Sequence, residues 1–340
     1  MSKKTTTILM AFLIVLIGIF LVQKYAGQPT GTPASLSELN IEFDPQAVNF
    51  IRVFKQDYPD SGLSFARKDT GWVVVNEFNT RAKSEEIKKL FDDVQAVSGS
   101  IRGESEDLYS DFSIDDRNAL QIKFLGADDS LLLHFFVGEG GPDGKSCFIR
   151  LPGSPNVYMA DNNFISRFAA WAASPEKKLP TDRWMNLRLC PIKTQELAAF
   201  KLGTPKTSYE FAQETLASED TTIPPTKKWT QVTPTKGVAL DESKIRSLSS
   251  SVTNISAQGV VNPENSTRFG LDKPSYSVWV GDTLGNAILV NFSDKIDTLE
   301  QRYVMIQGRD TVYRINKNLF DRIFVTPFEK PKEPKAAAGK

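Results

Sequence analysis

The segment Phe148-Ile-Arg-Leu-Pro-Gly-Ser-Pro-Asn-Val-Tyr-Met-Ala-Asp-Asn-Asn-Phe164 aligns without gaps on Tyr303-Val-Met-Ile-Gln-Gly-Arg-Asp-Thr-Val-Tyr-Arg-Ile-Asn-Lys-Asn-Leu319. In both, a Gly is followed after three residues by Val-Tyr, and after four more by Asn. Gly153 and Gly308 are predicted to turn hairpins between short strands. A short helix is expected next, with these apolar residues in the two copies: Phe164, Ile165 and Phe168, and Leu319, Phe320 and Ile323. The match indicates an internal duplication.

Further matches precede this segment in the same order in both halves. Gly71-Trp-Val-Val-Val75 resembles Lys228-Trp-Thr-Gln-Val232, and a helical pattern follows each. The apolar stripes of these two patterns are Ile87, Leu90, Val94 and Val97, and Ile245, Leu248, Val252 and Ile255. Such stripes are typical of helices that pack on a core. Ser84 and Asp241 are the predicted N-caps.

The strands between these landmarks alternate apolar and polar residues. Asp111-Phe-Ser-Ile-Asp115 corresponds to Arg268-Phe-Gly-Leu-Asp272, at the same offset that separates the two Trp strands. Two predicted strands follow each turn: 119–125 and 130–137 in the first copy, and 276–281 and 286–292 in the second. Each copy is therefore predicted to be an α+β domain, with an antiparallel sheet that carries two helices on one face.

The length of 340 residues also favours two domains, because a single core rarely grows past roughly 250–300 residues. The polar, Pro-marked segment Ser174-Pro-Glu-Lys-Lys-Leu-Pro-Thr-Asp-Arg183 is interpreted as the boundary. The predicted layout is a cytoplasmic N-terminus with a transmembrane anchor at 1–25, a linker at 26–40, a first repeat at 41–178, a second repeat at 179–329 and a disordered tail at 330–340.

The N-terminal region has an uncharged apolar run from Ile8 to Val22 behind Lys3 and Lys4. With its flanks it reaches the roughly 20 residues of a transmembrane helix, and the lysines favour a cytoplasmic N-terminus. We therefore expect a single-pass protein of the inner (cytoplasmic) membrane whose bulk is periplasmic or otherwise extracytoplasmic. A cleaved signal peptide, with an apolar region of about 7–15 residues, is the alternative.

Composition narrows the possible functions. Lys plus Arg and Asp plus Glu each number 41, so no net charge is available to attract phosphate backbones, and no nucleic-acid partner is expected. The chain has one histidine, His134, and two cysteines, Cys147 and Cys190, too few soft ligands for a typical zinc site. The cysteines form either a disulfide or two buried free thiols, and the sequence leaves both open.

Several patterns resemble chemical motifs but are better explained as loops or strands. The stretch 138–146 lacks the first Gly of a phosphate loop and leads into a predicted strand. Asp128-Asp129 is assigned to a hairpin turn, and the pairs Asp92-Asp93 and Asp115-Asp116 are expected to be solvated. His134 lies in a predicted strand, and no nucleophile elbow Gly-x-Ser-x-Gly occurs in the sequence. We predict no catalytic, cofactor-binding or metal-ligating residue and no cofactor.

Taken together, the Trp strand, the amphipathic helix, the Phe-x-Ile/Leu-Asp turn and the Gly-x-x-x-Val-Tyr hairpin are similar to the bacterial domain of unknown function 4340. The resemblance covers most of the chain after residue 40, once per copy. Members of that family often lie beside ABC transporters of the gliding-motility type, commonly behind an N-terminal membrane helix. The resemblance implies an accessory envelope subunit of such a transporter, and it supplies no catalytic residues.

We therefore expect a non-catalytic, membrane-anchored accessory protein rather than an enzyme. Its expected partners are the membrane, through the N-terminal helix, and the permease or other envelope proteins of a transporter complex. The alternative is a periplasmic binding module for a small molecule or glycan in the cleft between the repeats, because domain interfaces often hold ligands. Exposed aromatic residues lining that cleft, such as Trp171, Trp184 or Trp229, would favour the alternative.

Overall fold

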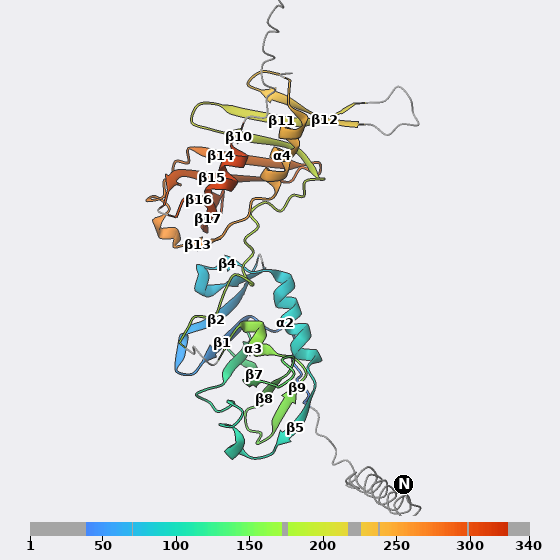
Figure 1. The fold of residues 1–340 in the computed structure, drawn as a ribbon, viewed down its shortest axis with the longest axis vertical. Coiled ribbons are helices and arrows are strands. Elements are labelled where there is room, and N and C mark those ends of the chain that lie inside the picture. Colours follow the sequence, from blue (N-terminus) through green and yellow to red (C-terminus); the bar gives the residue numbers. More distant parts are fainter. Residues whose placement is uncertain are drawn as a thin grey trace, which may run out of the picture.

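The computed structural model describes residues 39–69, 71–171, 176–216, 226–236, 239–297 and 299–325. These residues form two sheet-containing lobes, one from each half of the chain (Figure 1). The predicted anchor, most of the predicted linker and the predicted tail lie outside the described residues. No helix within the described ranges is long and apolar enough to cross a membrane.

The first lobe is a nine-stranded antiparallel sheet in the order β4-β3-β2-β1-β6-β7-β8-β9-β5. Its elements are β1 (Phe50–Lys55), β2 (Tyr58–Lys68), β3 (Gly71–Val74), β4 (Thr80–Arg81), α2 (Ser84–Ala96), β5 (Gly99–Gly103), β6 (Leu120–Leu125), β7 (Leu131–Gly140), β8 (Cys147–Arg150), β9 (Val157–Ala160) and α3 (Phe164–Phe168).

The second lobe is an eight-stranded antiparallel sheet in the order β12-β11-β10-β14-β15-β16-β17-β13. Its elements are β10 (Leu197–Gly203), β11 (Ser208–Leu216), β12 (Thr226–Thr233), α4 (Glu242–Thr253), β13 (Gly259–Val261), β14 (Tyr276–Asp282), β15 (Ala287–Ile296), β16 (Gln301–Ile306), β17 (Val312–Asn316) and α5 (Lys317–Ile323).

The two sheets follow one strand order. Read from β3 to β5, the first sheet corresponds strand by strand to the second sheet read from β12 to β13, and β4 has no counterpart among the described strands. The helices also correspond, since α2 and α4 follow the Trp strand and α3 and α5 end each copy. This shared topology indicates an internal repeat and confirms the predicted α+β class.

The predicted helix stripes are buried as expected. The four apolar residues of each stripe are at most 5% exposed, from Ile87 to Val97 in the first copy and from Ile245 to Ile255 in the second. Burying one such side chain contributes roughly 1.5–3 kcal/mol, so each stripe holds its helix on the sheet. The predicted hairpin glycines are confirmed as well, because Gly153 and Gly308 have φ of 74° and 78°.

Two local features differ from the predictions. A short strand, β5 or β13, follows the long helix in each copy and pairs at the sheet edge with β9 or β17. These strands were missed because they are short and start at glycines. The N-cap prediction for Asp241 is confirmed, since its carboxylate accepts from the Lys244 N–H at 3.0 Å. The prediction for Ser84 is wrong, because Lys83 is the N-cap and its own N–H donates to the Trp184 carbonyl.

The segment that joins the repeats contacts the first sheet and then the second. The Leu179 N–H donates to the Ser61 carbonyl at 2.9 Å, and the Asn186 N–H donates to the Arg81 carbonyl at 2.7 Å. Three residues later, the Leu189 N–H donates to the Ile255 carbonyl at 2.8 Å. The Pro-marked boundary assigns residues 179–186 to the second repeat. Leu179 and Asn186, at the two ends of this range, nevertheless bond to the first repeat.

Candidate functional site

A pocket of about 510 Å³ opens on the first repeat, where the β1–β2 hairpin, the start of β6 and the chain after α3 meet. We call it the lysine pocket. Its charged lining residues are Lys55, Lys177 and Lys178, and its aromatic lining residues are Phe54, Tyr58 and Trp171. The volume lies within the range of about 300–1,000 Å³ typical of small-molecule sites. The pocket is therefore the candidate binding site of the described chain.

Strand register and two hydrogen bonds build the walls of the lysine pocket. Lys55 ends β1, pairing with Leu120 of β6 on one side and with Tyr58 across the hairpin on the other. The Ser61 hydroxyl donates to the Glu176 carbonyl at 2.7 Å, and the Ser61 carbonyl accepts from the Leu179 N–H. The segment that carries Lys177 and Lys178 is thus fastened to β2.

The lysines bring three positive charges to the pocket, and the carboxylate of Glu176 acts on one of them, Lys55. None of the three forms an ion pair with a residue in the described ranges. Burial lowers the pKa of Lys55, and the Glu176 carboxylate opposes this shift from a distance. The ammonium group of Lys55 has therefore lost part of its hydration without gaining a contacting carboxylate.

The second repeat is hollowed at the corresponding place. A pocket of about 400 Å³ lies between the start of the β10–β11 hairpin, the start of β14 and the end of α5. Its lining includes Tyr276, Phe320 and Phe324, together with Lys206 and Asp321 of opposite charge. The hollow thus belongs to the repeated fold, and among the described residues three lysines line it in the first copy and one in the second.

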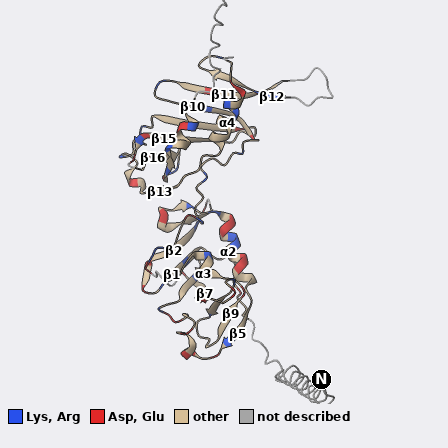
Figure 2. Ribbon diagram, in the orientation of Figure 1, with Lys and Arg blue, Asp and Glu red and all other residues tan. Residues whose placement is uncertain are grey.

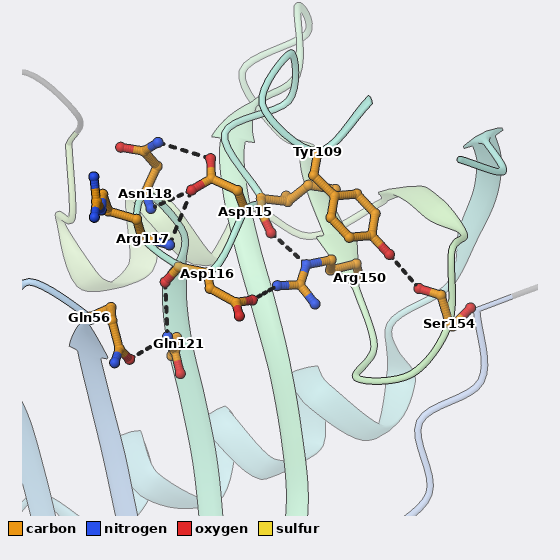
Figure 3. A network of polar contacts seen from close by, with 10 residues as sticks. Gln56, Tyr109, Asp115, Asp116, Arg117, Asn118, Gln121, Arg150 and Ser154 are labelled. Carbon is orange, nitrogen blue, oxygen red and sulfur yellow. Dashed lines mark hydrogen bonds and ion pairs between the residues drawn. The ribbon is translucent and has the colours of Figure 1, made fainter. Parts of the chain in front are cut away.

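The network around Arg150 on β8 is a second polar feature of the first repeat (Figure 3). The Arg150 side chain is 7% exposed, donates to the Ile114 carbonyl and forms an ion pair with Asp116. Its guanidinium lies 3.5 Å from the ring centroid of Phe136 and 4.7 Å from that of Tyr109. Ile114, Asp116 and Tyr109 lie in the loop before β6, and their contacts with Arg150 fix that loop against the sheet, so we assign the network to structure.

A similar ion pair holds α3 against α2. The Arg167 side chain is 6% exposed and pairs with Asp93, whose side chain is 25% exposed. Asp93 is therefore mostly shielded from water, and the prediction that it is solvated is wrong. Its carboxylate compensates the charge of the buried Arg167 guanidinium. Asp116 is 78% exposed, as expected, but it too is ion-paired.

His134, the only histidine in the sequence, lies on β7 as predicted. Burial, together with Lys123 and Arg150, lowers its pKa to about 4, so the imidazole is neutral at neutral pH. Its Nε2 is buried without a hydrogen-bond partner among the described residues. The described residues therefore give Nε2 no orienting hydrogen bond of the kind that supports a general base.

The two thiols are free and lie in different repeats. Cys147 is fully buried, donates to the Asn162 carbonyl at 3.1 Å, and has a pKa raised by burial to about 12. Cys190 is also fully buried, and burial raises its pKa. Because the thiolate is the reactive species, both thiols are inert in this fold.

The remaining sequence candidates are placed in turns. The stretch 138–146 leads into β8 as predicted, but its first three residues end β7, and the turn that follows has the Asp143 carboxylate accepting from the Lys145 and Ser146 N–H groups. Asp128 and Asp129 lie in the β6–β7 turn. No group of three or more metal-binding side chains occurs within the described part of the chain. Charges of both signs are spread over both lobes (Figure 2).

The three tryptophans proposed for a cleft between the repeats lie in different environments. Trp184 is 1% exposed and packs in the core of the first repeat, so it lines no cleft. Trp229 is half-buried against the ring of Phe200, 5.2 Å away. Trp171 is 56% exposed and borders the lysine pocket. The exposed aromatic therefore marks a pocket of one repeat.

The fold and its pockets define a tandem α+β repeat protein. A family model described as Domain of unknown function (DUF4340) matches residues 72–237 and 229–329, and the chain belongs to this family. The two matches begin at Trp72 and Trp229, the corresponding tryptophans of the two copies, which is consistent with tandem copies. No curated protein and no solved structure matches the chain.

Proposed function

We propose that this chain is a non-catalytic, membrane-anchored accessory protein that works on the extracytoplasmic side of a gliding-type ABC transporter or a related envelope assembly. The observation that carries the proposal is its membership of this family through two copies of one domain. The uncharged apolar run from Ile8 to Val22 supports the anchor.

The chemistry of the described residues supports a role without catalysis. His134 is the one side chain that titrates near neutral pH in its unperturbed form, and here it is held neutral on a strand. Cys147 and Cys190 are buried thiols with raised pKa values. A hydrolase or transferase would need a nucleophile within reach of a base, and these groups do not make such a pair.

Exposed leucines support a protein partner. Leu131 and Leu284 are 58% and 84% exposed, and both lie at the corresponding hairpin, β6–β7 in the first repeat and β14–β15 in the second. Isolated exposed leucines are ordinary, but one on the same hairpin of each copy suits a partner that engages both copies. Two linked contacts bind more tightly than either contact alone.

Affinity purification of the full chain in mild detergent tests this proposal. We expect a permease or an ATPase to be enriched with the native chain. The double variant Leu131→Ser, Leu284→Ser should recover less of that partner, while Val75→Ser, which changes another exposed apolar residue, should recover as much as the native chain. Recovery of a lone chain with neither a permease nor an ATPase would contradict the proposal.

A binding module for a small molecule is the second candidate function. The lysine pocket favours it, because the pocket combines a ligand-sized volume, an exposed tryptophan and unpaired ammonium groups. This site lies on the first repeat beside the joining segment, not in a cleft lined by Trp184. The two functions are compatible, since an accessory subunit can present a ligand to its transporter.

A further inference from the structure

We propose that the lysine pocket binds an organic acid whose anionic group contacts the lysines and whose apolar body lies against Trp171. The inference rests on the binding function proposed for this pocket and adds the chemical class of its ligand. It is independent of whether a transporter is the partner.

The anionic group follows from the charges of the pocket. Lys55 ends β1, Lys177 and Lys178 lie on the joining segment, and all three line the pocket. The Glu176 carboxylate acts on Lys55 from a distance, and no described carboxylate lies within ion-pair distance of the three lysines. A bound anion would form charge-assisted contacts with these ammonium groups and replace the hydration that Lys55 has lost to burial.

The apolar body follows from the other lining residues. Phe54, Tyr58 and Trp171 face the same cavity, and Trp171 remains 56% exposed without a ring contact to another described residue. Exposing an indole beside a cavity costs hydrophobic free energy that an apolar ligand would recover. Inorganic phosphate or sulfate would leave this surface in water, so an anion with an organic body fits better.

The described residues that line the two hollows differ in charge. The corresponding hollow of the second repeat has Thr204 where β10 leaves the sheet, and its lining includes Lys206 and Asp321, whose carboxylate pairs with Lys317 at 2.6 Å. The shared fold therefore produces a hollow without requiring an excess of positive charge. Among the described residues, three lysines line the pocket of the first repeat and one, Lys206, lines the hollow of the second.

Photo-crosslinking of the full chain in neutral-lipid nanodiscs tests the inference with a matched pair of probes. The probes are a trifluoromethyl-diazirine benzoate and the uncharged benzamide of the same skeleton. Mass spectrometry locates the label. We expect the benzoate to label peptides around Tyr58 and Trp171 roughly tenfold more than the benzamide. One charge-assisted contact changes the affinity by about that factor.

Variants of equal charge provide the control. The triple variant Lys55→Met, Lys177→Met, Lys178→Met should lose the preference for the benzoate. A second triple variant, Lys89→Met, Lys145→Met, Lys273→Met, removes three exposed lysines outside the pocket. This variant should keep the preference for the benzoate. Competition by dodecanoate or by benzoate would support the inference and would show whether an acyl chain or a compact aromatic body fits.

Two outcomes would overturn the inference. They differ in whether they also contradict the binding function proposed for the pocket. Equal labelling of the pocket by benzoate and benzamide would contradict recognition of an acid but leave the pocket as a binding site. Absence of label from pocket peptides with both probes would contradict the binding function as well. Neither outcome bears on the accessory role, which purification tests separately.

Discussion

The indole of Trp184 stacks on the phenyl ring of Phe168, with ring centroids 5.2 Å apart and planes inclined by 15°. Trp184 comes from the segment between the repeats, whereas Phe168 ends α3 of the first repeat. The same indole meets the ring of Phe65 edge-on at 5.1 Å. The joining segment therefore completes the core of the first repeat.

Replacing Trp184 should destabilise the first repeat. Trp184→Ala removes a fully packed aromatic side chain and should lower the free energy of unfolding by about 3–5 kcal/mol. Trp171→Ala, at a position 56% exposed, should change it by no more than about 0.5 kcal/mol. Hydrogen exchange of first-repeat peptides across a urea series measures both. Equal effects of the two substitutions would contradict the packing described for Trp184.

Loss of the carboxylate partner should destabilise the protein more at Arg167 than at Arg150. Asp93→Asn should cost roughly 3 kcal/mol, because it leaves the charge of Arg167 buried and uncompensated. Asp116→Asn should cost about 1 kcal/mol or less, because the Asp116 carboxylate is 78% exposed and screened by water. Urea denaturation of the two variants checks this order. A larger loss of unfolding free energy for Asp116→Asn than for Asp93→Asn would show that the exposure of the carboxylate does not determine the strength of these ion pairs.

His134 should make the stability of the chain depend on pH. Its folded-state pKa of about 4 lies below the value of about 6.5 expected for an unfolded chain, so the unfolded chain takes up the proton first. The stabilising contribution is complete above about pH 6.5 and is lost as the pH falls toward 4.

The variant His134→Leu isolates this contribution. Leu289 occupies the corresponding position of the second repeat, because Trp279 and Leu289 pair across β14 and β15 as Lys123 and His134 pair across β6 and β7. The native chain should lose stability relative to the variant between pH 6.5 and 4, as measured by urea denaturation at each pH. Parallel curves for both chains would show that His134 titrates normally.

Replacing Gly153 or Gly308, the hairpin glycines of the two repeats, by alanine should destabilise the protein to the same extent. An added Cβ meets no atom within 4 Å at Gly153 or Gly308, so the cost of alanine is the positive φ alone, about 1 kcal/mol each. Gly138→Ala should cost more, because its Cβ would meet the Phe112 carbonyl and the Ile114 side chain. Thermal unfolding of the three variants measures the effects, and unequal losses at Gly153 and Gly308 would argue against equivalent turns.

Much of the fold was predictable because its signals are local and occur twice. The stripe from Ile87 to Val97 fixes a helix by periodicity, and Gly153 fixes a turn by its backbone freedom. The second copy confirmed each element independently. The ring pairs Phe112–Phe148 and Phe269–Tyr303, with centroids 4.4 Å and 3.8 Å apart, lie where the alignment places equivalent residues.

The pocket and the ion pairs were not predictable, because they depend on contacts between distant segments. Lys55 reads only as the end of a strand, and Lys177-Lys178 reads as a solvated linker until hydrogen bonds at Ser61 bring them together. Asp93 likewise lies on the polar side of a helical pattern, and its partner Arg167 is 74 residues away. A lysine pair within a Pro-marked segment was the available signal for the pocket.

The central claim, that both repeats work outside the cytoplasm, is tested most directly by cysteine labelling. Cys147 and Cys190 are fully buried, so the native chain should stay unlabelled by a membrane-impermeant maleimide. Ala127→Cys and Leu284→Cys place one exposed thiol in the β6–β7 and β14–β15 turns. Both variants should be labelled in cells with an intact cytoplasmic membrane. Labelling only after that membrane is broken would contradict the account.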